Sequence, residues 1–99
     1  MKPVIFLPEA EEEMLEAARY YESQASGLGI DYLSEVERAV ASISESPMTW
    51  PKIEGELRRR LVWRFPFGIL YYIESEKIVL VAVAHLKRRP GYWKKRISF

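Results

Sequence analysis

The sequence contains no cysteine and only one histidine among its 99 residues. The lack of cysteine excludes disulfides, thiolate zinc sites and cysteine nucleophiles. The longest apolar run, residues 78–84, is far shorter than the roughly twenty residues that span a bilayer. The apolar residues near the N-terminus are likewise too few for a signal peptide. These absences lead us to expect a cytoplasmic protein without membrane association.

The charges are divided unevenly along the chain. Residues 1–56 contain four Lys/Arg and twelve Asp/Glu, a balance of −8, whereas residues 57–99 contain eleven Lys/Arg and two Asp/Glu, a balance of +9. Such segregation predicts a basic pole suited to phosphate or to an acidic partner. The alternative is that solvated helix faces are rich in Glu and strand ends are rich in Arg. The length and the absence of repeats or linkers predict a single domain over residues 1–99.

The first half has the apolar spacing of two helices. A stripe with period 3.6 begins near Pro8, and the glutamates that follow suit a helix N-terminus; its members are Ala10, Met14, Ala17, Tyr21 and Ala25. The segment 26–29 (SGLG) interrupts it. A second stripe spans about residues 30–44, and the short glycine-containing connection favours an antiparallel helical hairpin.

The second half has the patterns of strands. A short strand is expected at residues 3–7, near a sheet edge because prolines flank it. After a loop at residues 49–55, apolar residues and arginines alternate up to Phe65, which predicts one apolar and one arginine-rich face. Strands follow at residues 69–74 and 78–85, the latter buried on both faces and central. We therefore expect an α+β fold of order β-α-α-β-β-β: an antiparallel-rich four-stranded sheet, the helical hairpin on one face, and a short basic C-terminal tail.

Basic and aromatic side chains near the last strand are the candidate functional residues. His85 ends that strand beside three cations, which favour its neutral form, so it could act as a base; it could equally be a structural histidine held by a backbone partner. Five arginines could converge to bind phosphate, or could pair singly with glutamates of the helices: Arg58, Arg60, Arg64, Arg88 and Arg89.

Aromatic rings occur among cations in the tail. Tyr92 and Trp93 precede Lys94 and Lys95, a combination suited to stacking on an unpaired base. For Trp93 we favour burial against the core. No paired carboxylates for acid–base chemistry are evident, and we expect neither a metal nor a cofactor.

Four segments, spread over essentially the whole chain, carry a family resemblance. They are residues 17–22 (AARYYE), 28–29 (LG), 65–71 (FPFGILY) and 83–93 (VAHLKRRPGYW). Together they resemble the RelE/ParE superfamily of bacterial toxins, the toxic components of type II toxin–antitoxin modules. The last segment is similar to the ending of plasmid-stabilisation members. The superfamily's fold agrees with the element order expected from periodicity.

The resemblance implies a cognate antitoxin that wraps over the sheet and the hairpin, and one of two targets. RelE-like members cut messenger RNA on the ribosome, whereas ParE-like members poison DNA gyrase without nuclease residues. For a nuclease, the resemblance assigns catalytic roles to His85, Arg64, Arg89 and Tyr92. For contacts to a target or nucleic acid we expect Arg58, Arg60, Arg88, Lys94, Lys95 and Trp93.

Two features favour the gyrase-binding branch. Gly68 stands where RelE-like members usually have an arginine, whose loss would remove a clamp on the phosphate in the transition state. The segments Phe-Pro-Phe-Gly and Pro-Gly-Tyr-Trp are ParE-like. We therefore expect growth inhibition through gyrase, with cleavage of messenger RNA as the alternative.

Overall fold

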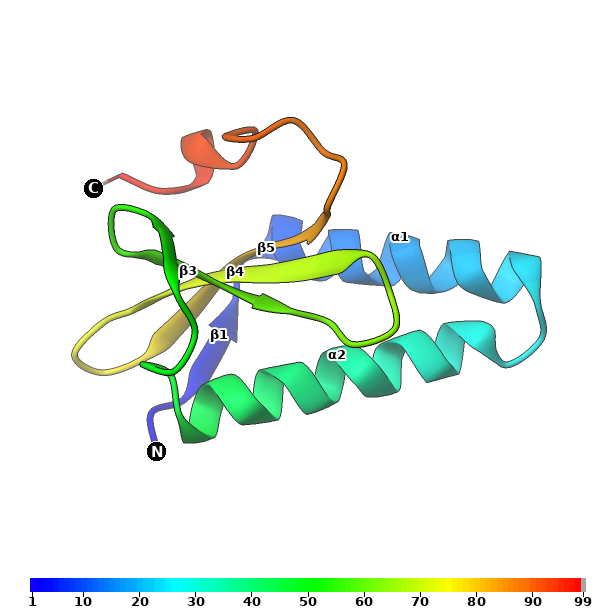
Figure 1. Ribbon diagram of the computed structural model, residues 1–99, viewed down its shortest axis with the longest axis horizontal. Coiled ribbons are helices and arrows are strands. Elements are labelled where there is room, and N and C mark those ends of the chain that lie inside the picture. Colours follow the sequence, from blue (N-terminus) through cyan, green and yellow to red (C-terminus); the bar gives the residue numbers. More distant parts are fainter. Residues whose placement is uncertain (99) are drawn as a thin grey trace.

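The computed structural model describes residues 1–98. Its elements in chain order are β1 (Val4–Phe6), α1 (Pro8–Gln24), α2 (Leu28–Glu45), β2 (Lys52–Glu54), β3 (Leu57–Leu61), β4 (Phe67–Ile73), β5 (Ile78–His85) and the 3-10 helix η1 (Lys94–Arg96). The helices α1 and α2 form the expected antiparallel hairpin beside the sheet (Figure 1). Within the described residues, no helix combines the length and apolar character needed to cross a membrane.

Glycines make the tight turn of the hairpin possible. Gly27 has a φ of 86°, in the left-handed region that glycine adopts at little cost. At Gly29 a Cβ would lie 2.6 Å from the carbonyl oxygen of Ala18, so the two helices approach too closely for any side chain there. The carboxylate of Glu22 accepts the N–H groups of Gly27 and Gly29, each at 3.0 Å, which satisfies donors at the start of α2.

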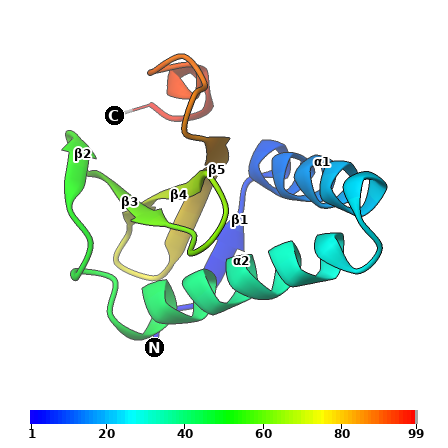
Figure 2. The same cartoon turned by 45° about the vertical axis from the view of Figure 1, so that its right-hand side comes forward.

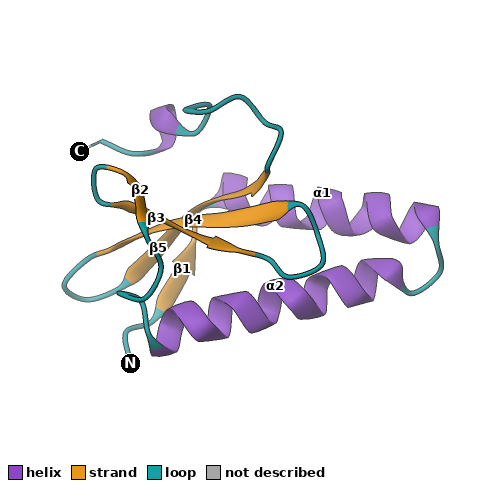
Figure 3. Ribbon diagram, in the orientation of Figure 1, coloured by secondary structure: helices purple, strands orange, loops and turns teal. Residues whose placement is uncertain are grey.

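The sheet has five strands in the order β1-β5-β4-β3-β2 (Figure 3). The strands β1 and β5 are parallel, and the other neighbours are antiparallel. The expected α+β architecture is confirmed, but the expected number of four strands is wrong. Residues 52–54, expected in a loop, form the edge strand β2 through pairing with β3. All three residues of β2 are exposed, so no apolar pattern could have indicated it.

Two apolar clusters cover the two faces of the sheet. The larger lies under the helices and includes Tyr32 and Ile43 of α2 against Ile69 of β4. The smaller lies on the opposite face, where Trp93, only 6% exposed, covers β4 and β5. Burial of Trp93 was the interpretation favoured from the sequence. The C-terminal segment, defined as residues 86–98, thus lies over the face that the helices leave open (Figure 2).

The alternation along β3 runs differently from the prediction. Leu57 is buried, but Leu61 and Trp63 are 48% and 69% exposed. The strand ends at Leu61, and Arg64 in the following turn has a φ of 76°. Because the turn starts early, the extended period of two does not continue to Phe65. Arg58 and Arg60 lie on the helix side of the sheet, where Arg60 contacts Ser42 of α2, while Leu57 and Arg59 lie on the other side.

Candidate functional site

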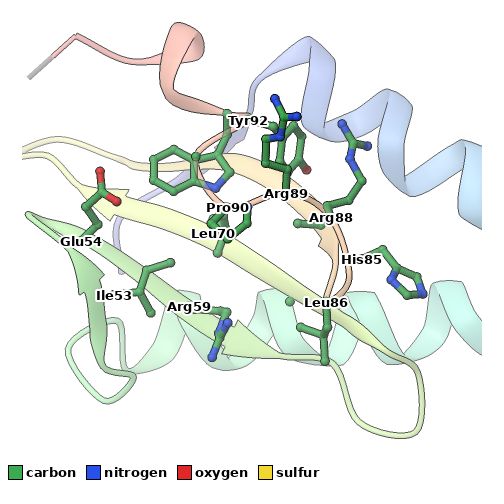
Figure 4. Close-up of a pocket in the computed structure, with 14 residues that line it drawn as sticks. Ile53, Glu54, Arg59, Leu70, His85, Leu86, Arg88, Arg89, Pro90 and Tyr92 are labelled. Carbon is green, nitrogen blue, oxygen red and sulfur yellow. The ribbon is translucent and has the colours of Figure 1, made fainter.

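A groove of about 260 Å³ lies on the sheet face opposite the helices. The strands β2, β3 and β4 form one side of it, and the C-terminal segment forms the other (Figure 4). Apolar side chains line much of it: Ile53, Leu70, Leu86 and Trp93. Basic side chains also line it: Arg59, Arg88 and Arg89, with His85 at the end of β5. An apolar floor bordered by cations suits a partner that is itself apolar and acidic.

Arg59 reaches the groove because β4 has a glycine beside it. A Cβ on Gly68 would lie 3.0 Å from Cδ of Arg59 and 3.1 Å from its Cγ. The aliphatic part of Arg59 therefore lies across Gly68, in space that any other residue would occupy. Glycine stands at position 68 instead of the arginine usual in RelE-like members, and it gives Arg59 room.

The arginines of the groove have no acidic partner in the part of the chain that the structure describes. Among residues 1–98, none of Arg59, Arg88 and Arg89 forms an ion pair with a carboxylate. Glu54 lines the groove, but its carboxylate lies 3.4 Å from Nζ of Lys94. Unpaired guanidinium groups at the edge of an apolar groove attract carboxylates or phosphates.

His85 is held as a structural histidine would be. Its Nδ1 accepts the backbone N–H of Lys87 at 3.0 Å, and its ring packs edge-on against Phe67 with centroids 5.1 Å apart. The ring is half-buried at the margin of the groove. This leaves Nε2 as the nitrogen that a ligand could contact.

Tyr92 forms part of the groove wall, but its hydroxyl is already engaged. The hydroxyl donates to Oε2 of Glu13 at 2.7 Å. The guanidinium carbon of Arg88 lies 3.8 Å from the centre of the Tyr92 ring, a cation–π contact. Burial and the hydrogen bond to Glu13 raise the pKa of Tyr92 above its usual value. The phenol therefore stays protonated at neutral pH.

A family model for the ParE toxin of type II toxin–antitoxin systems, parDE, matches residues 4–90. This chain belongs to the ParE toxin family. The match confirms the resemblance to the RelE/ParE superfamily and selects its ParE branch.

Solved structures agree with this family in fold. Ten chains match, among them one from a structure described as the chromosomal ParDE TA system from P. aeruginosa. That chain is 13% identical over 86% of this ParE-family toxin and 96% of its own length, with a TM-score of 0.64. At this identity the likeness shows a shared fold. No curated protein matches the sequence.

In this ParE-family chain the five arginines expected to converge do not. Arg58 donates to the carbonyl oxygens of Met48 and Trp50, at 3.2 and 2.6 Å. Nε of Arg60 donates to Oγ of Ser42 at 3.0 Å. These contacts lie on the helix side of the sheet, whereas Arg88 and Arg89 line the groove on the other side. The expected convergence is wrong because β3 turns alternate side chains to opposite faces.

Of the four residues expected to form a nuclease site, Arg64 lies apart from the other three. Arg64 lies 3.5 Å from Asp31 of α2 and over the ring of Phe65, outside the groove lining. His85, Arg89 and Tyr92 do line the groove. Lys94 and Lys95 are exposed on η1, and only Lys94 has an acidic partner among residues 1–98, Glu54. The described residues include no group of three His, Asp or Glu side chains that could hold a metal ion.

Sequence reasoning missed two residues of the site, Arg59 and Glu13. Arg59 occupies the face of the alternation that was expected to be apolar, together with Leu57, Leu61 and Trp63, so it was not among the expected site residues. The same period of two places Arg59 on the face of Leu57, which is the groove face. Glu13 stands in a run of three glutamates, and nothing in the sequence distinguishes it from its neighbours.

Proposed function

We propose that this chain is the toxin of a type II toxin–antitoxin module that arrests growth by binding DNA gyrase in the cytoplasm. We further propose that a cognate antitoxin neutralises it by occupying the groove. Membership of the ParE family supports the class of function. The observation that supports the rest is a set of three arginines that border an apolar groove and form no ion pair within residues 1–98.

The groove suits a protein segment that carries both carboxylates and apolar side chains. Apolar residues of such a segment would cover Leu70 and Ile53, while its carboxylates would pair with the groove arginines. Attraction between opposite charges would also speed the encounter. If the antitoxin and gyrase use the same surface, binding of one excludes the other, and neutralisation needs no conformational change.

The contacts of the groove residues favour binding over catalysis. Attack by a ribose 2′-hydroxyl needs a general base and a general acid within hydrogen-bond reach of the reacting atoms. The Tyr92 hydroxyl is bonded to Glu13, and Arg64 is paired with Asp31 away from the groove. Only His85 and Arg89 remain of the four residues that the nuclease hypothesis requires.

Inducible expression without an antitoxin tests the proposal. We expect growth arrest with DNA breaks and filamentation while transcripts stay intact, and inhibition of gyrase supercoiling by the purified protein. Co-expression of an antitoxin from the neighbouring reading frame should restore growth. The matched variant combines Arg59→Ala with Arg89→Ala. It should remain folded but should neither arrest growth nor inhibit gyrase.

The contrary outcomes are distinct. Cleavage of transcripts within minutes of induction, abolished by His85→Ala, would replace gyrase binding by the nuclease function. Growth without any defect would identify a chain that binds a partner but is not toxic.

A further inference from the structure

A single carboxylate on α1 joins three parts of the chain. Glu13 accepts four hydrogen bonds: from the backbone N–H of Val83 at 3.0 Å, from the Tyr92 hydroxyl at 2.7 Å, and from both terminal nitrogens of Arg96 at 2.9 Å. The Glu13 and Arg96 side chains are each only 14% exposed. Paired and shielded from water, they form the least exposed of the ion pairs found among residues 1–98.

The edge of β5 explains why a carboxylate is needed at this point. The strand β1 pairs with β5 only as far as Leu80, after which the chain turns into α1. The backbone groups of β5 beyond Leu80 therefore face side chains on that edge. Arg96 donates to the carbonyl oxygen of Val81 at 3.1 Å, and Glu13 accepts the N–H of Val83. The side chains of Arg96 and Glu13 thus satisfy backbone groups of β5 that β1 would have paired if it were longer.

The same carboxylate reaches the groove through Tyr92. The Tyr92 ring has the guanidinium of Arg88 at 3.8 Å on the groove side, and that of Arg96 at 5.0 Å. Glu13 holds the hydroxyl of this ring, and the ring supports Arg88. Arg88 has no carboxylate partner among residues 1–98, so its position depends on the ring that it stacks against.

We propose that Glu13 is a positioning residue for the groove. It fastens the C-terminal segment to β5 and holds Tyr92 so that Arg88 projects along the groove wall. The effect on partner binding rests on the function proposed above; the fastening of the segment does not. Glu13 itself lies outside the groove lining, so its influence on binding is exerted through Tyr92 and Arg96.

Glu13→Gln tests the proposal, with Glu12→Gln as the matched control. Both remove one negative charge from neighbouring positions of α1, but Glu12 pairs on the surface with Arg19. Glutamine cannot accept four hydrogen bonds from this set, and Arg96 would lose its counter-charge. We expect the Val83 amide to exchange with solvent roughly ten- to a hundredfold faster, the factor for losing a charge-assisted hydrogen bond. Trypsin should cleave after Lys94 and Lys95 correspondingly faster, and Glu12→Gln should change neither.

Titration of the phenols gives a signature that a general loss of stability would not produce. Burial, the hydrogen bond to Glu13 and the charge of Glu13 raise the pKa of Tyr92; in Glu13→Gln the pKa should fall, because the charge and its hydrogen bond are lost while Arg96 and Arg88 remain to lower it. Ultraviolet absorbance of the phenolates should show one tyrosine titrating at lower pH. Unchanged exchange, cleavage and titration in Glu13→Gln would overturn the fastening role.

Tyr92→Phe separates fastening from positioning and should fold, since it removes only the hydroxyl. The variant keeps the ring that Arg88 stacks against, and it leaves the Glu13–Arg96 ion pair intact. We expect gyrase inhibition to weaken by a few-fold in Tyr92→Phe and by at least tenfold in folded Glu13→Gln, with Glu12→Gln unchanged. A loosened segment with undiminished inhibition would overturn the link to the groove, yet leave gyrase binding standing. A wild-type protein that does not inhibit gyrase would refute the proposed function, while the exchange and cleavage readouts would still decide the fastening role.

Discussion

The arginines on the two faces of the sheet differ in what they contact. Arg58 and Arg60, on the helix side, donate to carbonyl and hydroxyl oxygens of the loop after α2 and of α2 itself. Arg59, between them in sequence, lies across Gly68 in the groove and has no acidic partner among residues 1–98. Three consecutive arginines thus divide into two that support the fold and one that is free to bind.

This difference separates stability from binding. A guanidinium whose donors are satisfied inside the protein adds to the free energy of unfolding and offers little to a partner. A guanidinium left unpaired beside an apolar groove contributes little to folding and is available to a carboxylate or phosphate. Substitutions on the two faces should therefore affect different measurements.

The largest effect is expected in the groove. Arg59→Ala combined with Arg89→Ala should weaken the affinity for the antitoxin by about a hundredfold, because two cations that would be desolvated in the complex are lost. The affinity should also depend less on salt. Isothermal titration at two salt concentrations measures both. The control is Lys87→Ala with Lys95→Ala, which removes the same charge from exposed positions outside the groove lining. Equal losses in the two double variants would mean that net charge, and not the groove, determines binding.

An intermediate effect is expected on the helix side. Arg58→Ala should lower the free energy of unfolding by about 2 kcal/mol, because the carbonyl oxygens of Met48 and Trp50 lose their donor. Urea denaturation measures this, with Arg59→Ala as the neighbouring control that should leave stability unchanged. The folded Arg58→Ala protein should keep its affinity for the antitoxin. A stability loss of similar size in Arg59→Ala would contradict the division between the faces.

The smallest effect is expected at Tyr32, beneath the helices. Its hydroxyl is buried and has no hydrogen-bond partner among residues 1–98, so Tyr32→Phe should raise the free energy of unfolding by up to about 1 kcal/mol at pH 7. Burial also raises the pKa of Tyr32. Unfolded tyrosine ionises near pH 10 while the folded one keeps its proton, so the wild type should lose stability above about pH 10 and the variant should lose less. Urea denaturation of the wild type and of Tyr32→Phe, at pH 7 and above about pH 10, measures both differences. Destabilisation at pH 7 would indicate that the hydroxyl has a partner after all.

Local patterns predicted the helices and the buried strand β5 correctly, although β4, not β5, is the middle strand of the sheet. The apolar stripes of α1 and α2 depend on spacings of three and four residues, and the short linker between them leaves little choice but a hairpin. The continuous apolar run of β5 predicted burial on both faces, and residues 78–83 are indeed buried. The motif ending in Pro-Gly-Tyr-Trp carried the family resemblance. Each of these signals is contained in one short stretch of chain.

The parts that were wrong or missed depend on residues far apart in sequence. The strand β2 exists only because β3 offers it an edge. The pairing of β4 and β5 shifts between Leu70 and Tyr71, so that Val81 and Ala82 face the same side, which no count along β5 would indicate. Likewise, Arg58 and Arg60 face the helices only because α2 packs on that side of the sheet.

The sequence alone determined the fold class, the family and the presence of a basic C-terminal half, because composition and periodicity are properties of the chain itself. The tertiary structure decided which cations stay unpaired and which acid holds the groove in place. Glu13 lies 70 residues from Val83, 79 from Tyr92 and 83 from Arg96. A carboxylate acquires such partners only when β5 and the C-terminal segment are packed beside α1, so its role is a property of the folded molecule.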